Sequence, residues 1–202
     1  MAIAQGSAKT YDRPVATPVA TKVPFAFVHI NKCGGSSVEI ALGVAKRHTG
    51  AARMREELGH EDWARRFTFA IVRNPFDRVV SIYYYRVRTD NGGLGDRHLS
   101  VNQWIEAVWS ERDPRYWNDT LLLAPSWDWV SQNGQMLVDE IARLETIDQD
   151  WAAIAARLGV APTLDRWNSN HHPDYRLLLS PRARKVIETA FAEDFERFGY
   201  CY

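Results

Sequence analysis

The chain has little cysteine, no excess charge of either sign and no long apolar run. Two of its 202 residues are cysteines, Cys33 and Cys201, which are too few for a disulfide framework or a cysteine-rich metal site. Lys and Arg together number 25, as do Asp and Glu, so the formal net charge is zero. This balance does not indicate a general polyanion-binding surface, and we expect no nucleic-acid partner.

Targeting and membrane signals are also missing. No apolar run approaches the ~20 residues that cross a bilayer, and the N-terminus lacks a signal-peptide pattern. We therefore expect no membrane span and a cytoplasmic location. Residues 1–22 are rich in Ala, Thr, Pro and Lys without hydrophobic periodicity, which predicts a disordered tail. Residues 23–202 have a length that suits one domain with a substantial core.

The most informative segment is FAFVHINKCGGSSVEI, residues 25–40. An apolar strand leads to Lys32, two glycines, and then Ser36 and Ser37 at the start of a helix. Glycines let backbone amides approach a phosphate, and a helix N-terminus adds partial positive charge. The serines can cap the helix or donate to phosphate oxygens. An ordinary strand-to-helix turn with a surface lysine is the alternative. The pattern GxxxxGK[ST] is absent, so a standard P-loop NTPase is excluded.

A second segment, FTFAIVRNPFDRVVSIYYYRVR at residues 67–88, has a similar organisation. Its apolar run predicts a strand that ends at Arg73, and the following Asn-Pro pair predicts a helix start. Ser81 lies about two turns into that helix. Because ligands of open α/β sheets bind at the carboxyl ends of strands, Lys32 and Arg73 suit a ligand with two anionic groups. Alone, Arg73 also fits a capping ion pair, and Ser81 a neutral surface position.

The order of elements predicts an α/β fold. Further helices are expected around 36–47, 52–66, 100–109, 148–158 and 180–198, and a later strand within 135–146. This order predicts a single domain with a central parallel sheet and helices on both faces. Residues 111–135 and 161–179 look irregular, as binding loops often do. One third of the chain holds Trp104, Trp109, Trp117, Trp127 and Trp129, for which core packing is the default role and a cleft lined by aromatic rings the alternative.

The paired motifs resemble those of sulfotransferases that use 3′-phosphoadenosine 5′-phosphosulfate. HINKCGGSS is similar to their HxPKxGGTS loop, and VRNPFDRVVSIYYY is similar to RDPxxRxxSxYxx. The nearest branch is that of the carbohydrate sulfotransferases, which includes uronyl 2-O- and chondroitin enzymes and many bacterial relatives. The resemblance runs from residue 23 to the C-terminus, and it implies a P-loop-NTPase-like sulfotransferase fold.

The resemblance also implies a role for each motif residue. The 5′-phosphosulfate would be held by the loop Lys32, Cys33, Gly34, Gly35, Ser36 and Ser37. Lys32 would also neutralise the bridging oxygen as the sulfuryl group leaves, and Arg73 and Ser81 would bind the 3′-phosphate. The acceptor would be a hydroxyl of a carbohydrate or another small molecule, and no metal is implied. Asn31 stands where the family has proline, and Asn74 where it has aspartate.

Transfer to a hydroxyl needs a base, and histidine is suited to this near neutral pH. Related carbohydrate sulfotransferases place a catalytic histidine between the two donor motifs, often after glycine. Gly59-His60 resembles that arrangement, so His60 is the predicted base, although an exposed helix residue is the alternative. The fallback bases are Glu39, Glu61 and Asp62. Four other histidines are expected to have other roles. His29 is expected to be structural, and His48 to end a helix. His171 and His172 are a weak signal for a metal site.

Two other functions remain open from the residues. A basic glycine loop after a strand also suits a kinase, but the GK[ST] pattern and an obvious magnesium-binding carboxylate pair are missing. An inactive adenosine-nucleotide-binding module is the third possibility, and a retained Lys32 argues against it. A thiol enzyme based on Cys33 is less favoured than a small loop residue.

Overall fold

A sheet of three parallel strands lies at the centre of the computed structural model, in the order β1-β2-β5. The strands are β1 (Phe25–Val28), β2 (Phe67–Val72) and β5 (Glu140–Arg143). All residues of the middle strand are buried, as expected of a parallel strand covered on both faces. The predicted α/β fold with a parallel sheet is confirmed. The structure describes residues 17–90, 94, 99–165 and 172–202.

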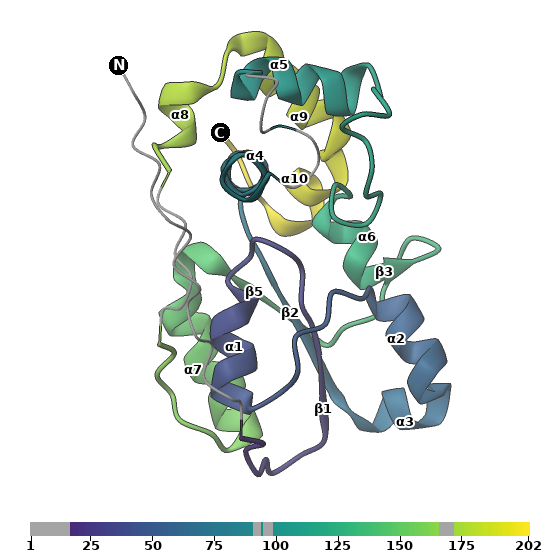
Figure 1. Ribbon diagram of the computed structural model, residues 1–202. Coiled ribbons are helices and arrows are strands. Elements are labelled where there is room, and N and C mark those ends of the chain that lie inside the picture. Colours follow the sequence, from purple (N-terminus) through teal and green to yellow (C-terminus); the bar gives the residue numbers. More distant parts are fainter. Residues whose placement is uncertain (1–16, 91–93, 95–98, 166–171) are drawn as a thin grey trace.

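Helices surround the sheet and extend past one end of it. They are α1 (Gly35–Leu42), α2 (Ala51–Leu58), α3 (His60–Arg65), α4 (Pro75–Thr89), α5 (Val101–Ile105), α6 (Ser126–Val130), α7 (Ile147–Leu158), α8 (Tyr175–Leu178), α9 (Pro181–Ala190) and α10 (Ala192–Phe198). Shorter elements are the π-helix η1 (Glu106–Ser110), the 3-10 turn η2 (Leu144–Thr146) and the hairpin β3 (Ser131–Gln132) with β4 (Gln135–Met136). Figure 1 shows α1 and α7 to one side of the strands, and α2 and α3 to the other.

The buried side chains form two clusters. One surrounds the sheet, and the other lies between α4, α5 and α9 beyond the carboxyl ends of the strands (Figure 1). The tryptophans of the central region belong to these clusters: Trp104, Trp109, Trp127 and Trp129 are all buried. These four tryptophans pack the core, and Trp117 is partly buried against the second cluster.

A fully buried arginine on α4 connects the loop that follows β1 to the segment that precedes α6. Arg78 donates through Nε to the backbone oxygen of Asn31 at 3.2 Å, and through one terminal nitrogen to its Oδ1 at 2.7 Å. Its other terminal nitrogen donates to the carbonyl of Ala124 at 2.7 Å. Nearby, the buried carboxylate of Asp194 accepts from the backbone amide of Ser126 at 2.8 Å. Polar groups at this depth are stable only when paired in this way.

The helix predicted over 36–47 is shorter, since α1 ends at Leu42. Gly43 follows it with a φ of 65°, a left-handed conformation that closes the helix. A Cβ at Gly43 would lie 1.9 Å from the carbonyl oxygen of Thr17, so no other residue fits there. Residues 44–50 are therefore a connector that returns toward the carboxyl end of β1 before α2 begins.

Other predicted boundaries also change. The stretch 52–66 is two helices, because Gly59 adopts a φ of 85° between them. The predicted helix over 180–198 breaks at Phe191 into α9 and α10. The region 111–135 is less irregular than expected, because it contains α6 and the β3-β4 hairpin.

Part of the predicted tail, residues 1–22, is packed against the domain. Residues 1–16 lie outside the described part of the chain. Residues 17–22 pack along the domain, where the amide of Val19 donates to Leu42 at 3.4 Å and that of Lys22 to Leu158 at 2.8 Å. The folded unit therefore begins before residue 23.

Replacing Arg78 with leucine should lower the free energy of unfolding by about 3–5 kcal/mol, because several buried carbonyls lose their donor at once. Urea unfolding followed by tryptophan fluorescence measures this change. Arg65, which is exposed on α3, provides the control, and Arg65→Ala should change stability by less than about 0.5 kcal/mol. A loss in Arg78→Leu as small as that in the control would contradict the structural role of this arginine.

Candidate functional site

The loop from Lys32 to Ser37 follows β1 and opens α1. Gly34 is the N-cap of α1, with a φ of 80°, and no side chain caps this end. Ser36 and Ser37 lie inside the first turn, so the capping role considered for them is wrong. The first amides of a helix have no acceptor four residues earlier and favour an anion, although here the amide of Ser37 donates to the carbonyl of Gly34 at 3.1 Å. Lys32 has a φ of 64°, a strained conformation that is common at binding sites.

Gly35 is required by the close approach of a histidine. A Cβ on Gly35 would lie 2.2 Å from Cδ2 of His29, so only glycine fits. The Nδ1 of His29 is 2.5 Å from Oε1 of Glu39 on α1, and both side chains are buried. This pair fixes the loop against the end of β1, which agrees with the structural role expected of His29. Glu39 was a fallback base in the sequence analysis, and here its carboxylate is paired with His29.

Lys32 lies in a basic and partly dehydrated environment. Its Nζ is 4.6 Å from the ring centroid of Tyr85 on α4, in a cation–π contact. Burial, together with the positive charges of Arg73, Arg88 and Lys46, lowers the pKa of Lys32 from 10.5 to about 8. An anion placed on the loop would relieve this repulsion, so the lysine gains most from a phosphate or sulfate ligand.

Arg73 lies beside this loop, as expected for two neighbouring parallel strands. One terminal nitrogen of Arg73 donates to the backbone oxygen of Lys32 at 3.1 Å. Its Nε donates to Asp77 at 2.8 Å, which gives an ion pair with the first turn of α4. The structure therefore brings the two predicted cationic residues together at one end of the sheet.

Ser81 lies one turn further along α4 than Asp77 and one turn before Tyr85. It is fully buried, and its Oγ has no hydrogen-bond partner among the residues that the structure describes. A buried hydroxyl without a partner costs about 1–3 kcal/mol, so such groups need an explanation. A phosphate oxygen held by Arg73 would supply the missing partner, and the residues present fit such a ligand.

Cys33 is buried, and its Sγ is 3.6 Å from the backbone oxygen of Asn31. Burial raises the pKa of this thiol to about 11, so it stays protonated and is a poor nucleophile. Only its backbone can face a ligand on the loop. Asn31, in place of the proline of the resembled motif, provides the side-chain oxygen that Arg78 binds.

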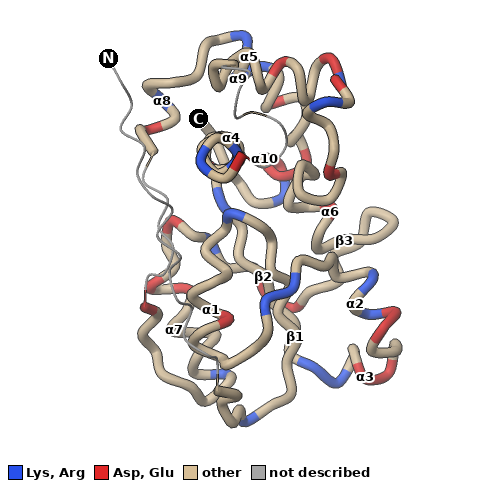
Figure 2. Tube along the Cα trace, viewed as in Figure 1, with Lys and Arg blue, Asp and Glu red and all other residues tan. Residues whose placement is uncertain are grey.

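Positive charge is local, as the zero net charge requires. Figure 2 shows Lys and Arg at the junction of β2 with α4 and along the connector that precedes α2, both next to the carboxyl end of β1. These positions surround the loop that follows β1. An anion bound there meets several positive charges without a generally basic protein surface.

A model of the sulfotransferase family matches residues 17–201. The chain belongs to the sulfotransferase family. An uncharacterised protein of Archaeoglobus fulgidus is 27% identical over 128 residues, which are 62% of this chain and 96% of that protein. A sulfotransferase from Alicyclobacillus acidocaldarius, known from its crystal structure, is 22% identical with a TM-score of 0.41. That likeness covers 73% of this chain and only 56% of the other.

The structure does not bring His60 to the loop of residues 32–37. His60 is the exposed first residue of α3, which leads into the amino end of β2. The loop follows the carboxyl end of β1, which runs parallel to β2, so the two lie at opposite ends of the sheet (Figure 1). Glu61 and Asp62, the other fallback bases on α3, pair with Arg65 and Arg66 at the same remote end.

His48 lies at the correct end of the sheet, because the connector 44–50 turns back. Its ring centroid is 4.3 Å from that of His29, whose ring in turn contacts Gly35. Its Nδ1 lies 3.1 Å from the backbone oxygen of His29. A carbonyl only accepts, so Nδ1 carries the proton and Nε2 keeps a free lone pair in the neutral ring. Partial burial lowers the pKa of His48 below its ordinary 6.5, which keeps the ring neutral.

Glu145 stabilises the start of α4 from the neighbouring strand. Its carboxylate accepts from the backbone amide of Asn74 at 2.7 Å and from the hydroxyl of Tyr200 at 3.0 Å. Asn74, in turn, caps α4 through a 3.0 Å bond from the amide of Phe76. This carboxylate therefore orders the turn between β2 and α4.

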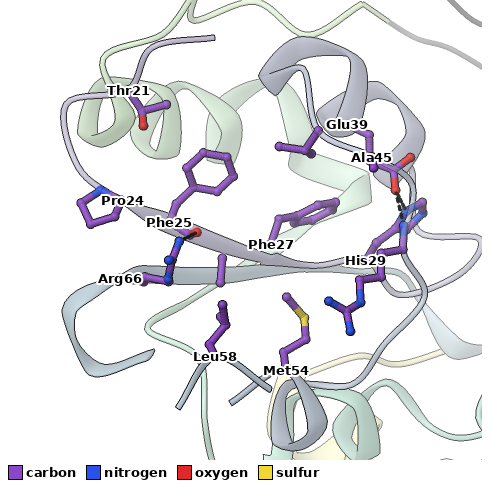
Figure 3. Close-up of a pocket in the computed structure, with 13 residues that line it drawn as sticks. Thr21, Pro24, Phe25, Phe27, His29, Glu39, Ala45, Met54, Leu58 and Arg66 are labelled. Carbon is purple, nitrogen blue, oxygen red and sulfur yellow. Dashed lines mark hydrogen bonds and ion pairs between the residues drawn. The ribbon is translucent and has the colours of Figure 1, made fainter. Parts of the chain in front are cut away.

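A cavity of about 460 Å³ lies beside β1, between the strand and the connector that leads to α2. Figure 3 shows Phe25, Phe27, Met54 and Leu58 along it and the His29–Glu39 pair at one end. His29 thus contacts both this cavity and Gly35. Among the described residues, no group of three or more His, Cys, Asp or Glu side chains is placed to hold a metal ion. No described helix is long and apolar enough to cross a membrane.

The lowered pKa of Lys32 predicts how the affinity for adenosine 3′,5′-bisphosphate depends on pH. Affinity should fall above about pH 8, where the free lysine loses its proton, and Lys32→Arg should abolish that fall because arginine stays charged. Titration calorimetry between pH 7 and pH 10 measures both proteins. Parallel pH profiles for the two proteins would show that Lys32 does not face the nucleotide.

Proposed function

We propose that this protein transfers a sulfuryl group from 3′-phosphoadenosine 5′-phosphosulfate to an acceptor hydroxyl. The observation that carries the proposal is the pairing of an uncapped, lysine-bearing loop with Arg73 and the unpartnered hydroxyl of Ser81 at one end of the sheet. Two anionic groups of one ligand fit these two positions. Family membership supports sulfuryl transfer as the reaction class.

In the proposed reaction the acceptor oxygen attacks sulfur, and the bond from sulfur to the bridging phosphate oxygen breaks. Lys32 and the first amides of α1 neutralise the charge that grows on the departing 5′-phosphate. Arg73 and Ser81 hold the 3′-phosphate, which is distant from the reacting bond. Their contacts are therefore similar in the ground and transition states and contribute mainly to donor binding.

We assign the acceptor proton to His48 in place of His60. The neutral ring presents Nε2 as the acceptor, and the ring packs at a tilt against His29, whose own ring lies close to Gly35 of the loop. Proton transfer to this nitrogen gives an imidazolium whose Nδ1 still donates to the His29 carbonyl. That hydrogen bond holds the ring in one orientation throughout the reaction.

The proposed acceptor is a carbohydrate hydroxyl, and this rests on the resemblance of the two motifs alone. The buried tryptophans give it no further support. A kinase or an inactive nucleotide-binding module is less well supported, because the family match favours sulfuryl transfer. Transfer of labelled sulfate from the donor to carbohydrate, phenolic and protein hydroxyls tests the proposal. Binding of the donor without transfer to any acceptor would favour the inactive module.

His48→Ala should slow turnover by about 10²–10⁴-fold, the usual contribution of a general base, and leave affinity for the bisphosphate nearly unchanged. His60→Ala is the matched control and should retain normal turnover, because that residue lies at the other end of the sheet. In the native protein turnover should fall as the pH drops through the pKa of His48, which burial holds below the ordinary 6.5, since protonation removes the base. The reverse pattern in the two variants would restore His60 as the base.

Donor binding and transfer should persist after exhaustive chelation, because Lys32, Arg73 and the loop amides supply the positive charge. The measurement is the turnover rate with EDTA, with and without added magnesium. Magnesium-dependent recovery of activity would support phosphoryl transfer in place of the proposed reaction.

A further inference from the structure

His172 is a buried histidine that the proposed chemistry does not use. Its side chain is 4% exposed, and it follows a stretch outside the described residues. The ring stacks on Tyr84 of α4, with centroids 5.8 Å apart and an interplanar angle of 15°. Its Nε2 lies 3.1 Å from a terminal nitrogen of Arg73 and 3.7 Å from Oδ1 of Asp77. A residue 99 positions away in sequence thus meets the proposed phosphate-binding arginine.

The hydrogen bonds define which nitrogen of His172 carries the proton. Nδ1 is 3.0 Å from the backbone oxygen of Pro173, which can only accept, so Nδ1 donates. Nε2 then holds a lone pair and accepts from the guanidinium of Arg73, which can only donate. In this arrangement His172 takes up a hydrogen-bond donor of Arg73 that a phosphate oxygen would otherwise use.

We propose that His172 is a further ligand of the donor's 3′-phosphate, and that it is hydrogen-bonded to Arg73 until the donor binds. This inference depends on the proposed function, since it assumes a donor with a 3′-phosphate. When a phosphate oxygen takes the guanidinium donor, Nε2 of His172 faces that oxygen. Two acceptors cannot form a hydrogen bond, so Nε2 takes a proton from solvent, and the resulting imidazolium donates an N–H hydrogen bond to the phosphate.

The groups around His172 accommodate this change. Among the described residues, those that face its ring are Arg73, Asp77 and Tyr84, all from α4 or the turn before it. Asp77 balances the new charge on the imidazolium, and the dianionic phosphate lies between the two cations. Tyr84 holds the plane of the ring. His172 therefore detects the 3′-phosphate specifically and contributes nothing to the 5′-phosphate.

The test compares two nucleotides that differ only in that group, adenosine 3′,5′-bisphosphate and adenosine 5′-monophosphate. His172→Ala should reduce the affinity ratio between them by about tenfold, the value of one charge-assisted hydrogen bond. Affinity for the monophosphate should not change, which also shows that the variant is folded. Arg176→Ala, on exposed α8, removes a charge from the same segment and should keep the native ratio.

Proton uptake separates a ligand from a merely structural residue. Calorimetry in two buffers of different ionisation enthalpy at about pH 8, where the phosphate is already dianionic, should show one more proton taken up with the bisphosphate than with the monophosphate. Subtraction cancels any uptake by Lys32, which both nucleotides contact. His172→Gln, whose amide can donate without titrating, should keep most of the affinity ratio and lose the additional uptake.

Two results would overturn the inference. If His172→Ala binds the bisphosphate as tightly as the native protein, or more tightly, His172 only competes with the phosphate for Arg73. Equal proton uptake with the two nucleotides would likewise exclude an imidazolium ligand. If the native protein does not prefer the bisphosphate to the monophosphate, the proposed donor is wrong, and that outcome is distinct from a failure of the His172 assignment.

Discussion

The site depends on the buried guanidinium of Arg78. It holds both the backbone and the side-chain oxygen of Asn31, immediately before the lysine of the loop, and with its other nitrogen the carbonyl of Ala124. The entry to the loop, the start of α4 and the segment before α6 are thereby fixed to one another. Because each of these groups is buried, no water can replace the arginine. The strained backbone at Lys32 is maintained by this surrounding structure.

Without ligand, the charged groups of the site are paired with one another. Lys32 lies over Tyr85, and Arg73 is shared by Asp77, the Lys32 carbonyl and His172. These partners keep the cations oriented, so binding of a ligand costs less conformational entropy. Ser81 has no such substitute among the described residues. In the proposed complex a ligand replaces some existing hydrogen bonds and adds a new one at Ser81.

Local sequence signals predicted the features that depend on a few neighbouring residues. The strand at 67–72, the Asn74 cap and the lysine-glycine turn were found because each has a chemical signature within a few positions. The return of the connector 44–50 toward β1 left no such signature, so His60 was preferred to His48. The contact between His172 and Arg73 joins residues 99 apart, and only tertiary packing creates it. Sequence therefore predicted the strand, the turn and the helix of each motif, but not the contacts that other segments make with them.

A crystal structure with adenosine 3′,5′-bisphosphate tests the central claim, which is that one nucleotide joins the Lys32 loop to Arg73. We expect the 5′-phosphate on the first amides of α1 with Nζ of Lys32, and the 3′-phosphate between Arg73 and the Oγ of Ser81. The hydroxyl that lacks a described partner should then be hydrogen-bonded. A nucleotide bound elsewhere, or one whose 3′-phosphate leaves Arg73 and Ser81 untouched, would contradict the account.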